Sequence, residues 1–321
     1  MSDPPETPAP DTPQTPGMDA AQIAAAEMQA QELAVAADAG PDQPTDTPDD
    51  ADDLRGYHFK RLLSQVSTWV IIAVFVIAAG AAAGIYFKGA AFGGAAAGAV
   101  LVIALIAVFA LADSRAEDAF FVHYAKQNNF VLGGQSFLPE ATPLLRKGDS
   151  RYAERTLTGD LAPGVNGTLA LYTYEEETTD SEGNRQTNYY RYTVGLIQLP
   201  EVVQLMPELY VQRKFGLRAL EKLEDKFRGS KERVELESEA LDKKYEIFVN
   251  EKQDANWVRQ LFAPTFIVWL IQNTPDKFAF ELVNGTLCCY ANNHKEKAAD
   301  LDRMRVATAA VATRLREESA E

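Results

Sequence analysis

The chain has 321 residues and a formal net charge of −15 at pH 7, and this acidity is concentrated at one end. The first 54 residues contain 13 Asp or Glu and no Lys or Arg, which leaves −2 of the total for residues 55–321. A nearly neutral body without runs of basic and aromatic residues excludes a nucleic acid partner. The adjacent cysteines, Cys288 and Cys289, exclude a disulfide framework and predict buried reduced thiols that point to opposite faces of a strand.

Residues 1–54 form the first predicted region, a disordered acidic tail. Nine of the 16 prolines lie here, and residues 1–17 and 38–53 offer almost nothing to bury. Between them, residues 18–38 are rich in Ala and Gln, which favours a transient helix; the alternative is a docking helix for a partner. Because the first residues are acidic, the tail is not expected to be a signal peptide.

Two long apolar stretches follow the tail. Arg61 and Lys88 are separated by 26 residues without Asp, Glu, Lys or Arg, and Lys88 and Asp113 by 24. A helix that crosses a bilayer needs about 20 apolar residues. We therefore predict a transmembrane hairpin in residues 55–113, with spans at 66–86 and 90–112 and a turn around Lys88 and Gly89.

The flanks of this hairpin predict its orientation. The turn is too short to hold a domain, so both flanks must lie on the same side of the bilayer. The flanks carry four basic residues, whereas the turn carries only Lys88. Because basic residues are enriched on the cytoplasmic side, this predicts a multi-pass protein of the plasma (inner) membrane with both termini in the cytoplasm. The basic flanking residues are Arg55, Lys60, Arg61 and Arg115. The aromatic residues expected at the two interfaces are Trp69 on one side and Tyr86, Phe87 and Phe92 on the other.

Glycines recur at four-residue spacing around the turn, and this spacing lets another backbone approach a membrane helix closely. The glycines either pack the two spans against each other or join the hairpins of different chains. The candidate helix-packing residues are Gly80, Gly84, Gly89, Gly93, Gly94 and Gly98. Neither span contains an ionisable residue, which argues against a transporter.

Residues 114–321 have the composition of a globular domain, which we place in the cytoplasm. A helix continuing from the second span over 114–127 and a loop with a short helix at 137–149 come first. The expected strands are 154–161, 168–177, 188–199, 208–213, 234–238 and 244–250. A helix is expected at 217–227 and another at 254–273, the latter kinked or restarted at Pro264.

The end of the domain carries two strong local signals. Asn284-Gly285 predicts a tight hairpin within residues 278–291. Asn293 with Glu296 predicts a capping box for a last helix that runs to about residue 317. Because the strands come as hairpins, we predict an α+β fold, an antiparallel sheet with helices packed on it, after the transmembrane hairpin and the disordered tail.

Several short motifs are individually common, but their order along the chain resembles that of a known family. They are Leu138-Pro139, Gly148-Asp149, Leu199-Pro200, the Glu-Ser-Glu at 237–239 before KYEIFVN, and Leu261 to Leu270 with Pro264. Over about residues 60–300, paired spans included, the chain resembles bacterial membrane proteins with two N-terminal spans and a cytoplasmic domain of unknown function 3137. The resemblance implies an architecture and a membrane location, and it supplies no chemistry.

The sequence predicts no catalytic, cofactor-binding or metal-binding residue. The histidines, His58, His123 and His294, lack ligand spacing. Asp180, Glu182 and Asn184 alternate as in a calcium loop, but Arg185 stands where such a loop needs glycine, so a solvated acidic hairpin tip is expected.

The basic residues Arg218, Lys222 and Lys226 recur at four-residue spacing on the predicted helix 217–227. Acidic residues between them are typical of a solvated helix, but beneath an anionic leaflet this stripe is a candidate lipid-facing surface. The leading hypothesis is a non-enzymatic, membrane-anchored binding or scaffold module that contacts a protein partner or anionic lipid headgroups. The alternatives are a membrane-tethered enzyme without a recognisable motif and a homo-oligomeric membrane scaffold organised by the glycines.

Overall fold

The computed structural model describes residues 51–214 and 231–320. The predicted tail over residues 1–50 lies outside the described residues. So does the predicted helix 217–227, with the candidate lipid-facing residues Arg218, Lys222 and Lys226.

The two apolar stretches form the helices α3 (Val66–Tyr86) and α4 (Ala90–Gln127), joined by a turn in which Lys88 has a φ of 50°. Both are long and apolar enough to cross a membrane. With a rise of 1.5 Å per residue, α3 is about 31 Å long, close to the ~30 Å of a bilayer core. Ile72 is the buried residue of α3, and most of its large apolar side chains are exposed. A helix that is apolar all round and not buried by protein is typical of a membrane span.

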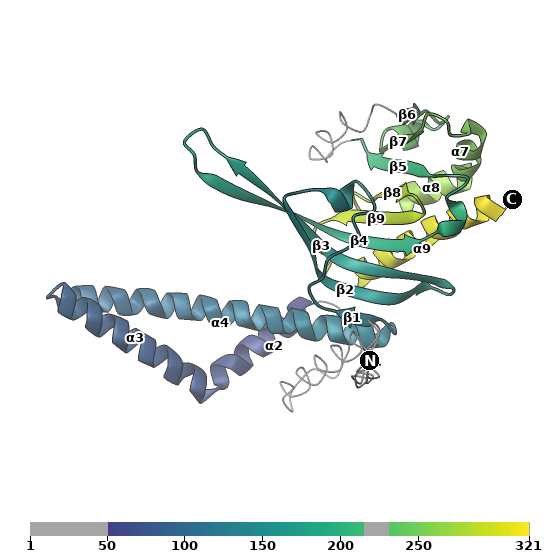
Figure 1. Cartoon of the computed structure of the whole chain (residues 1–321). Coiled ribbons are helices and arrows are strands. Elements are labelled where there is room, and N and C mark those ends of the chain that lie inside the picture. The colour runs from purple at the N-terminus through teal and green to yellow at the C-terminus, as the bar shows by residue number, and fades with distance from the viewer. Residues whose placement is uncertain (1–50, 215–230, 321) are drawn as a thin grey trace, which may run out of the picture.

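A helix that the sequence did not predict precedes the hairpin. Helix α2 (Ala51–Ser64) packs against α4 through a cluster of Leu54 with Ala116 and Ala119, and Arg55 Nε lies 2.5 Å from Asp113 Oδ1. It ends at Ser64, and α3 begins after Gln65 at a clear angle, so that α2 and α3 form a V beside α4 (Figure 1). Residues 51–54, predicted to belong to the tail, are therefore the first turn of a packed helix.

The domain is an antiparallel sheet with helices, which confirms the predicted α+β class. The strand order is β1-β2-β3-β4-β9-β8-β5-β7-β6, and every neighbouring pair is antiparallel. The strands are β1 (Val131–Gly133), β2 (Ser150–Ala162), β3 (Val165–Thr179), β4 (Arg185–Gln198), β5 (Glu208–Arg213), β6 (Lys231–Val234), β7 (Tyr245–Asn250), β8 (Ala279–Val283) and β9 (Thr286–Asn292). The described helices of the domain besides α4 are η1 (Leu144–Arg146), η2 (Pro200–Val202), α6 (Glu239–Asp242), α7 (Ala255–Leu261), α8 (Pro264–Gln272) and α9 (Ala298–Ala320).

Two local predictions are confirmed by backbone geometry. Pro264 is the first residue of α8 and follows the end of α7 by only three residues, so the helix restarts at the proline, whose missing N–H is tolerated at a first helical position. Asn284 and Gly285 have φ values of 47° and 80°, which is the pair of positive angles that the β8–β9 hairpin turn needs.

Two other predictions are wrong. The strand expected at 234–238 ends at Val234, because Ser238 caps α6 by accepting a hydrogen bond from the Leu241 N–H at 3.3 Å. The capping box at Asn293 does not form. Asn293 has a φ of 65° and its carbonyl accepts a hydrogen bond from Thr193, so the chain stays tied to β4 and α9 begins only at Ala298.

The two faces of the sheet are covered differently. Helix α9 and the C-terminal end of α4 cover one face, where Leu301 and Met304 share a large apolar cluster with Phe120 and Leu169. Residues 134–149, here called the strap, cover part of the other face (Figure 1). Leu144 and Leu145 of the strap pack there against four buried tyrosines, which are Tyr172, Tyr174, Tyr192 and Tyr290.

Strands β3 and β4 extend beyond their other neighbours as a two-stranded arm. Strand β2 pairs with β3 only as far as Glu175, and β9 pairs with β4 only from Tyr192 onward. At the exposed tip, Asp180 Oδ1 accepts hydrogen bonds from the backbone N–H groups of Glu182 and Asn184. These bonds keep the pKa of Asp180 low, and its carboxylate shapes a solvated turn.

Candidate functional site

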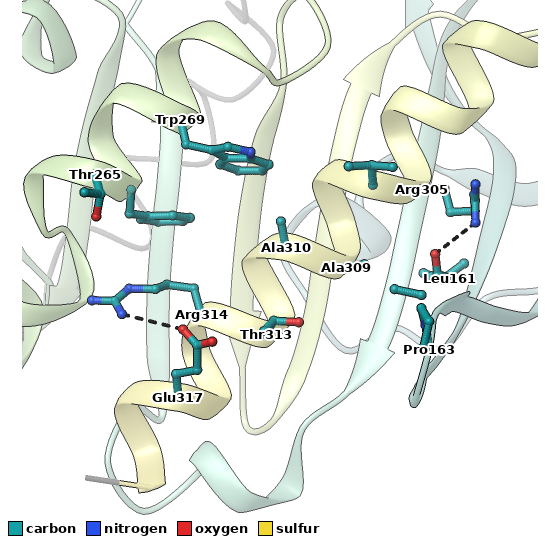
Figure 2. Close-up of a pocket in the computed structure, with 13 residues that line it drawn as sticks. Leu161, Pro163, Thr265, Trp269, Arg305, Ala309, Ala310, Thr313, Arg314 and Glu317 are labelled. Atoms are coloured by element: carbon teal, nitrogen blue, oxygen red, sulfur yellow. Dashed lines mark hydrogen bonds and ion pairs between the residues drawn. The ribbon is translucent and has the colours of Figure 1, made fainter.

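An open groove of about 640 Å³ lies between α8 and α9. We call it the α8–α9 groove (Figure 2). Apolar and small side chains make up most of its lining: Leu161, Ala162, Pro163, Phe266, Trp269, Val306, Ala309 and Ala310. The polar lining residues are Thr265, Thr313, Arg305, Arg314 and Glu317.

The local sequence explains the shape of this groove. On α8, the rings of Phe266 and Trp269 stack with centroids 5.7 Å apart and an interplanar angle of 9°, which makes one flat wall. On α9, the lining residues recur at spacings of three and four along one helical face, from Val306 to Glu317. Ala310, near the middle of that face, has a small side chain that leaves the groove open at this point. The opposite face of α9 is buried against the sheet.

Two arginines of α9 are held by backbone carbonyls at the groove. Arg305 donates through Nη1 to the Leu161 carbonyl at 3.3 Å, and Arg314 donates through Nη2 to the Gln260 carbonyl at 2.6 Å. Arg314 also lies 3.7 Å from a carboxylate oxygen of Glu317 (Figure 2). Glu317 is the single carboxylate among the lining residues, and no histidine joins it. Arg305 is also paired with Asp302, and Arg314 with Glu318. The groove thus offers apolar contact area beside two arginines whose charges are already paired, and its lining lacks an acid–base pair.

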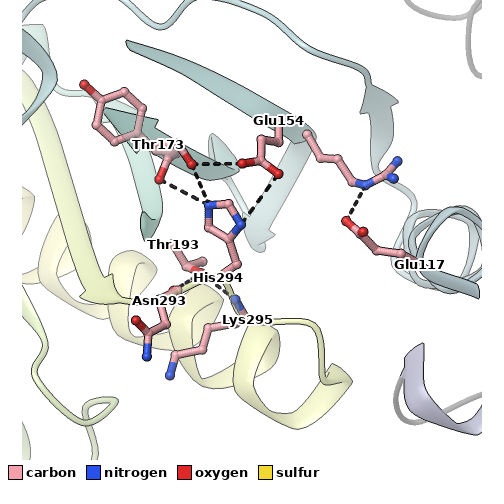
Figure 3. A network of polar contacts seen from close by, with 9 residues as sticks. Glu117, Glu154, Thr173, Thr193, Asn293, His294 and Lys295 are labelled. Carbon is pink, nitrogen blue, oxygen red and sulfur yellow. Dashed lines mark hydrogen bonds and ion pairs between the residues drawn. The ribbon is translucent and has the colours of Figure 1, made fainter. Parts of the chain in front are cut away.

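A second polar group, at the start of α9, has the residue types of a catalytic triad. His294 Nε2 lies 3.2 Å from Thr173 Oγ1, and His294 Nδ1 lies 3.8 Å from Glu154 Oε2 (Figure 3). Such a group would need the threonine hydroxyl to give its proton to the histidine.

The hydrogen bonds show that this proton goes elsewhere. The Thr173 hydroxyl donates to Glu154 Oε1 at 2.9 Å, and His294 Nε2 lies 3.3 Å from the Tyr172 carbonyl oxygen, which only accepts. Nε2 therefore carries a hydrogen and cannot act as a base toward Thr173. Thr173 is also completely buried. Burial lowers the pKa of His294, and the charge of Glu154 opposes this shift. The group is a structural link between β2, β3 and the segment that leads into α9.

Arg155 links the C-terminal end of α4 to the sheet. Its guanidinium group lies 3.0 Å from Glu117 and 2.5 Å from Asp118, both on α4, and 5.3 Å from the centre of the Phe121 ring. Tyr124 of α4 adds a hydrogen bond from its hydroxyl to Asp302 of α9 at 3.0 Å. The apolar helix and the domain are thus joined by charged contacts as well as by the core.

Glu281 of β8 is a completely buried carboxyl group beneath the strap. Its Oε2 accepts a hydrogen bond from the Leu144 N–H at 3.0 Å. Burial raises the pKa of Glu281, and this hydrogen bond together with Thr142 and Lys147 opposes the shift. The neighbouring Cys288 is also buried, which raises the pKa of its thiol and makes it a poor nucleophile. We interpret Glu281 as the residue that fastens the strap to the sheet.

The structure brings only some of the six glycines together. A Cβ atom at Gly93 would lie 2.8 Å from the Gly80 carbonyl oxygen and 3.4 Å from the Gly84 Cα, so these three form the close contact between α3 and α4. Gly89 is the residue before α4. A Cβ atom at Gly94 or Gly98 would meet nothing within 4 Å, so both lie on an outer face of α4.

The histidines and cysteines are placed separately. His58 lies on α2, His123 on α4, and His294 after β9. Cys288 and Cys289 are free and buried, one in the tyrosine cluster under the strap and the other in the core on the opposite face. Within residues 51–214 and 231–320, no three His, Cys, Asp or Glu are grouped so that they could hold a metal ion.

Comparison with known proteins gives no match: no family model, curated protein or solved structure is similar to this chain.

Proposed function

We propose that this chain is a membrane-anchored binding module whose cytoplasmic domain holds a protein partner in the α8–α9 groove. The observation that carries the proposal is the groove itself, which is open, mostly apolar and flanked by arginines that backbone carbonyls hold in place. Binding surfaces for helical segments combine an apolar groove with a few fixed polar groups in this way.

The shape of the groove indicates the kind of segment that it accepts. Its α9 side runs from Val306 to Glu317, which at 1.5 Å per residue is about 16 Å, or three helical turns. Val306 is 53% exposed, a large apolar side chain that the domain leaves uncovered. A short helix with an apolar stripe fits this lining.

The anchoring part of the proposal is a transmembrane hairpin in the plasma membrane with both termini in the cytoplasm. It is supported by the two exposed apolar helices and by the basic residues on their flanks. Membership of the bacterial family with domain of unknown function 3137 belongs to the same proposal. Helix α8 and the C-terminal end of α9 lie at the end of the molecule away from the α3–α4 turn, which leaves the groove open to a partner from the cytoplasm (Figure 1).

The test is affinity purification of the full-length chain from its own membrane, with three versions compared. The groove variant Val306→Asp/Thr313→Asp places two charges on exposed groove positions. The control variant Thr187→Asp/Thr179→Asp places the same number of charges on exposed positions of the arm. We expect a partner that the wild type and the control retain and the groove variant loses. The same set of proteins from all three versions would refute the proposal.

Self-association through the hairpin is a second candidate, because a specific observation favours it. Gly94 and Gly98 are four residues apart on α4 and have open space before them, whereas Gly80, Gly84 and Gly93 are used within the hairpin. The outer face of α4 could therefore receive a helix from a second chain.

A further inference from the structure

Helix α2 descends along α4 toward the bilayer. Leu54 packs beside Ala116 and Ala119 of α4, whereas the Phe59 ring lies 5.7 Å from the Phe109 ring. As the residue number rises along α2, its contacts on α4 therefore move toward the apolar span. The two helices are antiparallel, and the C-terminal end of α2 is the end nearer the membrane.

The contact between Arg55 and Asp113 serves as a reference height along α4, from which the depth of other α2 residues is measured. Asp113 is the first ionisable residue after the second span, and Arg55 Nε lies 2.5 Å from its carboxylate. Lys60 and Arg61 follow Arg55 by five and six residues. With a rise of 1.5 Å per residue they lie up to about 9 Å closer to the bilayer centre, which is roughly the depth of one headgroup layer.

The faces of α2 show which of these cations points outward. Leu54, His58 and Leu62, at four-residue spacing, are buried and form the face toward α4. Lys60 stands on the opposite face and is exposed, and Arg61 is half-buried at the side. Beyond them, the Trp69 indole N–H donates to the Leu63 carbonyl at 2.7 Å, and the half-exposed ring lies where an interfacial tryptophan belongs.

We infer that the C-terminal half of α2 binds the phosphate groups of anionic lipids through Lys60 and Arg61. A lysine at this depth extends its ammonium group toward the headgroups. Each cation beside an anionic leaflet contributes about 1 kcal/mol of binding free energy, which is about a fivefold preference for anionic over neutral lipid. This inference rests on the proposed membrane placement of the hairpin, and it adds a ligand and a site to it.

The test uses the full-length chain in nanodiscs of phosphatidylcholine, with Trp257→Phe and Trp269→Phe in every sample so that Trp69 is the only tryptophan. The probes are a few per cent of phosphatidylglycerol or phosphatidylcholine with the same pyrene-labelled acyl chain. We expect stronger quenching of Trp69 by the phosphatidylglycerol probe, corresponding to about 25-fold enrichment for the two cations together, and a ratio near one for Lys60→Gln/Arg61→Gln. The exposed Lys60→Gln alone should lose about half of the enrichment on a logarithmic scale.

The matched control is Lys252→Gln/Arg259→Gln, which removes one lysine and one arginine that are exposed near α7. It should keep the wild-type ratio. Equal quenching by both probes in the wild type, or an unchanged ratio in the α2 variant, would overturn the inference while leaving the anchor intact. Absence of quenching by either probe would refute the membrane placement itself, and the lipid site with it.

Discussion

Replacing Glu281 with Gln is expected to make the domain more stable at neutral pH than the wild type. The folded protein buries this carboxyl and raises its pKa, so the folded state binds its proton more tightly than the unfolded chain does. The stability that comes from this proton is fully present below the unfolded pKa of about 4.3 and is lost as the pH rises through the raised folded pKa. A glutamine has the same shape, cannot ionise, and keeps an oxygen for the Leu144 N–H.

The size of the effect follows from the linkage of one proton. Between the unfolded and folded pKa values, the wild type loses up to about 1.4 kcal/mol per pH unit relative to the variant. For a domain of this length, 1 kcal/mol corresponds to about 2–4 °C in Tm. The difference in Tm between Glu281→Gln and wild type should therefore grow by about 3–5 °C per pH unit above pH 4.5 until the folded pKa is passed.

Thermal unfolding of the full chain in detergent micelles, followed by near-ultraviolet circular dichroism between pH 4.5 and 8, measures this difference. Glu235→Gln is the control, because Glu235 is an exposed carboxylate directly after the edge strand β6 of the same sheet. Its Tm should follow the wild type at every pH. A difference between Glu281→Gln and wild type that stays constant with pH would show that Glu281 does not titrate as its burial requires.

Two further predictions concern α9 and the hairpin. Because the pKa of His294 is lowered, the stability from its neutral ring is present above about pH 6.5 and is lost as the pH falls through the folded value. Between pH 6.5 and 5, the Tm of His294→Gln should therefore fall less than that of the wild type. The same fall in Tm for both proteins over this pH range would contradict the prediction. Gly94→Leu/Gly98→Leu should reduce crosslinked oligomers of the reconstituted chain, whereas Gly93→Leu should separate α3 from α4, seen as a longer spin-label distance. An unchanged ladder of crosslinked species for the first variant would exclude the outer glycine face as a contact.

The elements that could be predicted from the sequence are those whose signal is local. The spans 66–86 and 90–112 follow from uninterrupted apolar runs, and α3 has the predicted bounds. The strand 208–213 was also predicted at its observed bounds. The turn at Asn284-Gly285 and the restart at Pro264 depend on backbone preferences of single residues, which tertiary contacts did not override.

The elements that were missed depend on partners distant in the chain. Helix α2 has a weakly apolar sequence, and it owes its packing to Ala116, Ala119 and Asp113 of α4. The capping box failed because Thr193, a hundred residues away, binds the Asn293 carbonyl. Glycine spacing likewise did not distinguish Gly93, which meets α3, from its neighbour Gly94, which meets nothing.

The α8–α9 groove belongs to the second kind. The sequence predicted both helices but not that Val306 and Thr313 would be left outside the core while Leu301 and Met304 entered it. The pattern of exposed positions at three- and four-residue spacing on α9 was present in the sequence. Only the position of Trp269 on the adjacent helix turns that pattern into a groove.

Helix α4 is a single 38-residue element that begins in the apolar hairpin and ends beside the sheet (Figure 1). From Ala99 to Gln127 it contains neither glycine nor proline, so its C-terminal part has no natural hinge. Arg155 and Tyr124 fix its last turns to β2 and α9. A span tilts when the thickness of its bilayer changes, and a stiff α4 would then act as a lever that turns the whole domain. The direction in which the groove faces would thereby depend on the thickness of the membrane that holds the anchor.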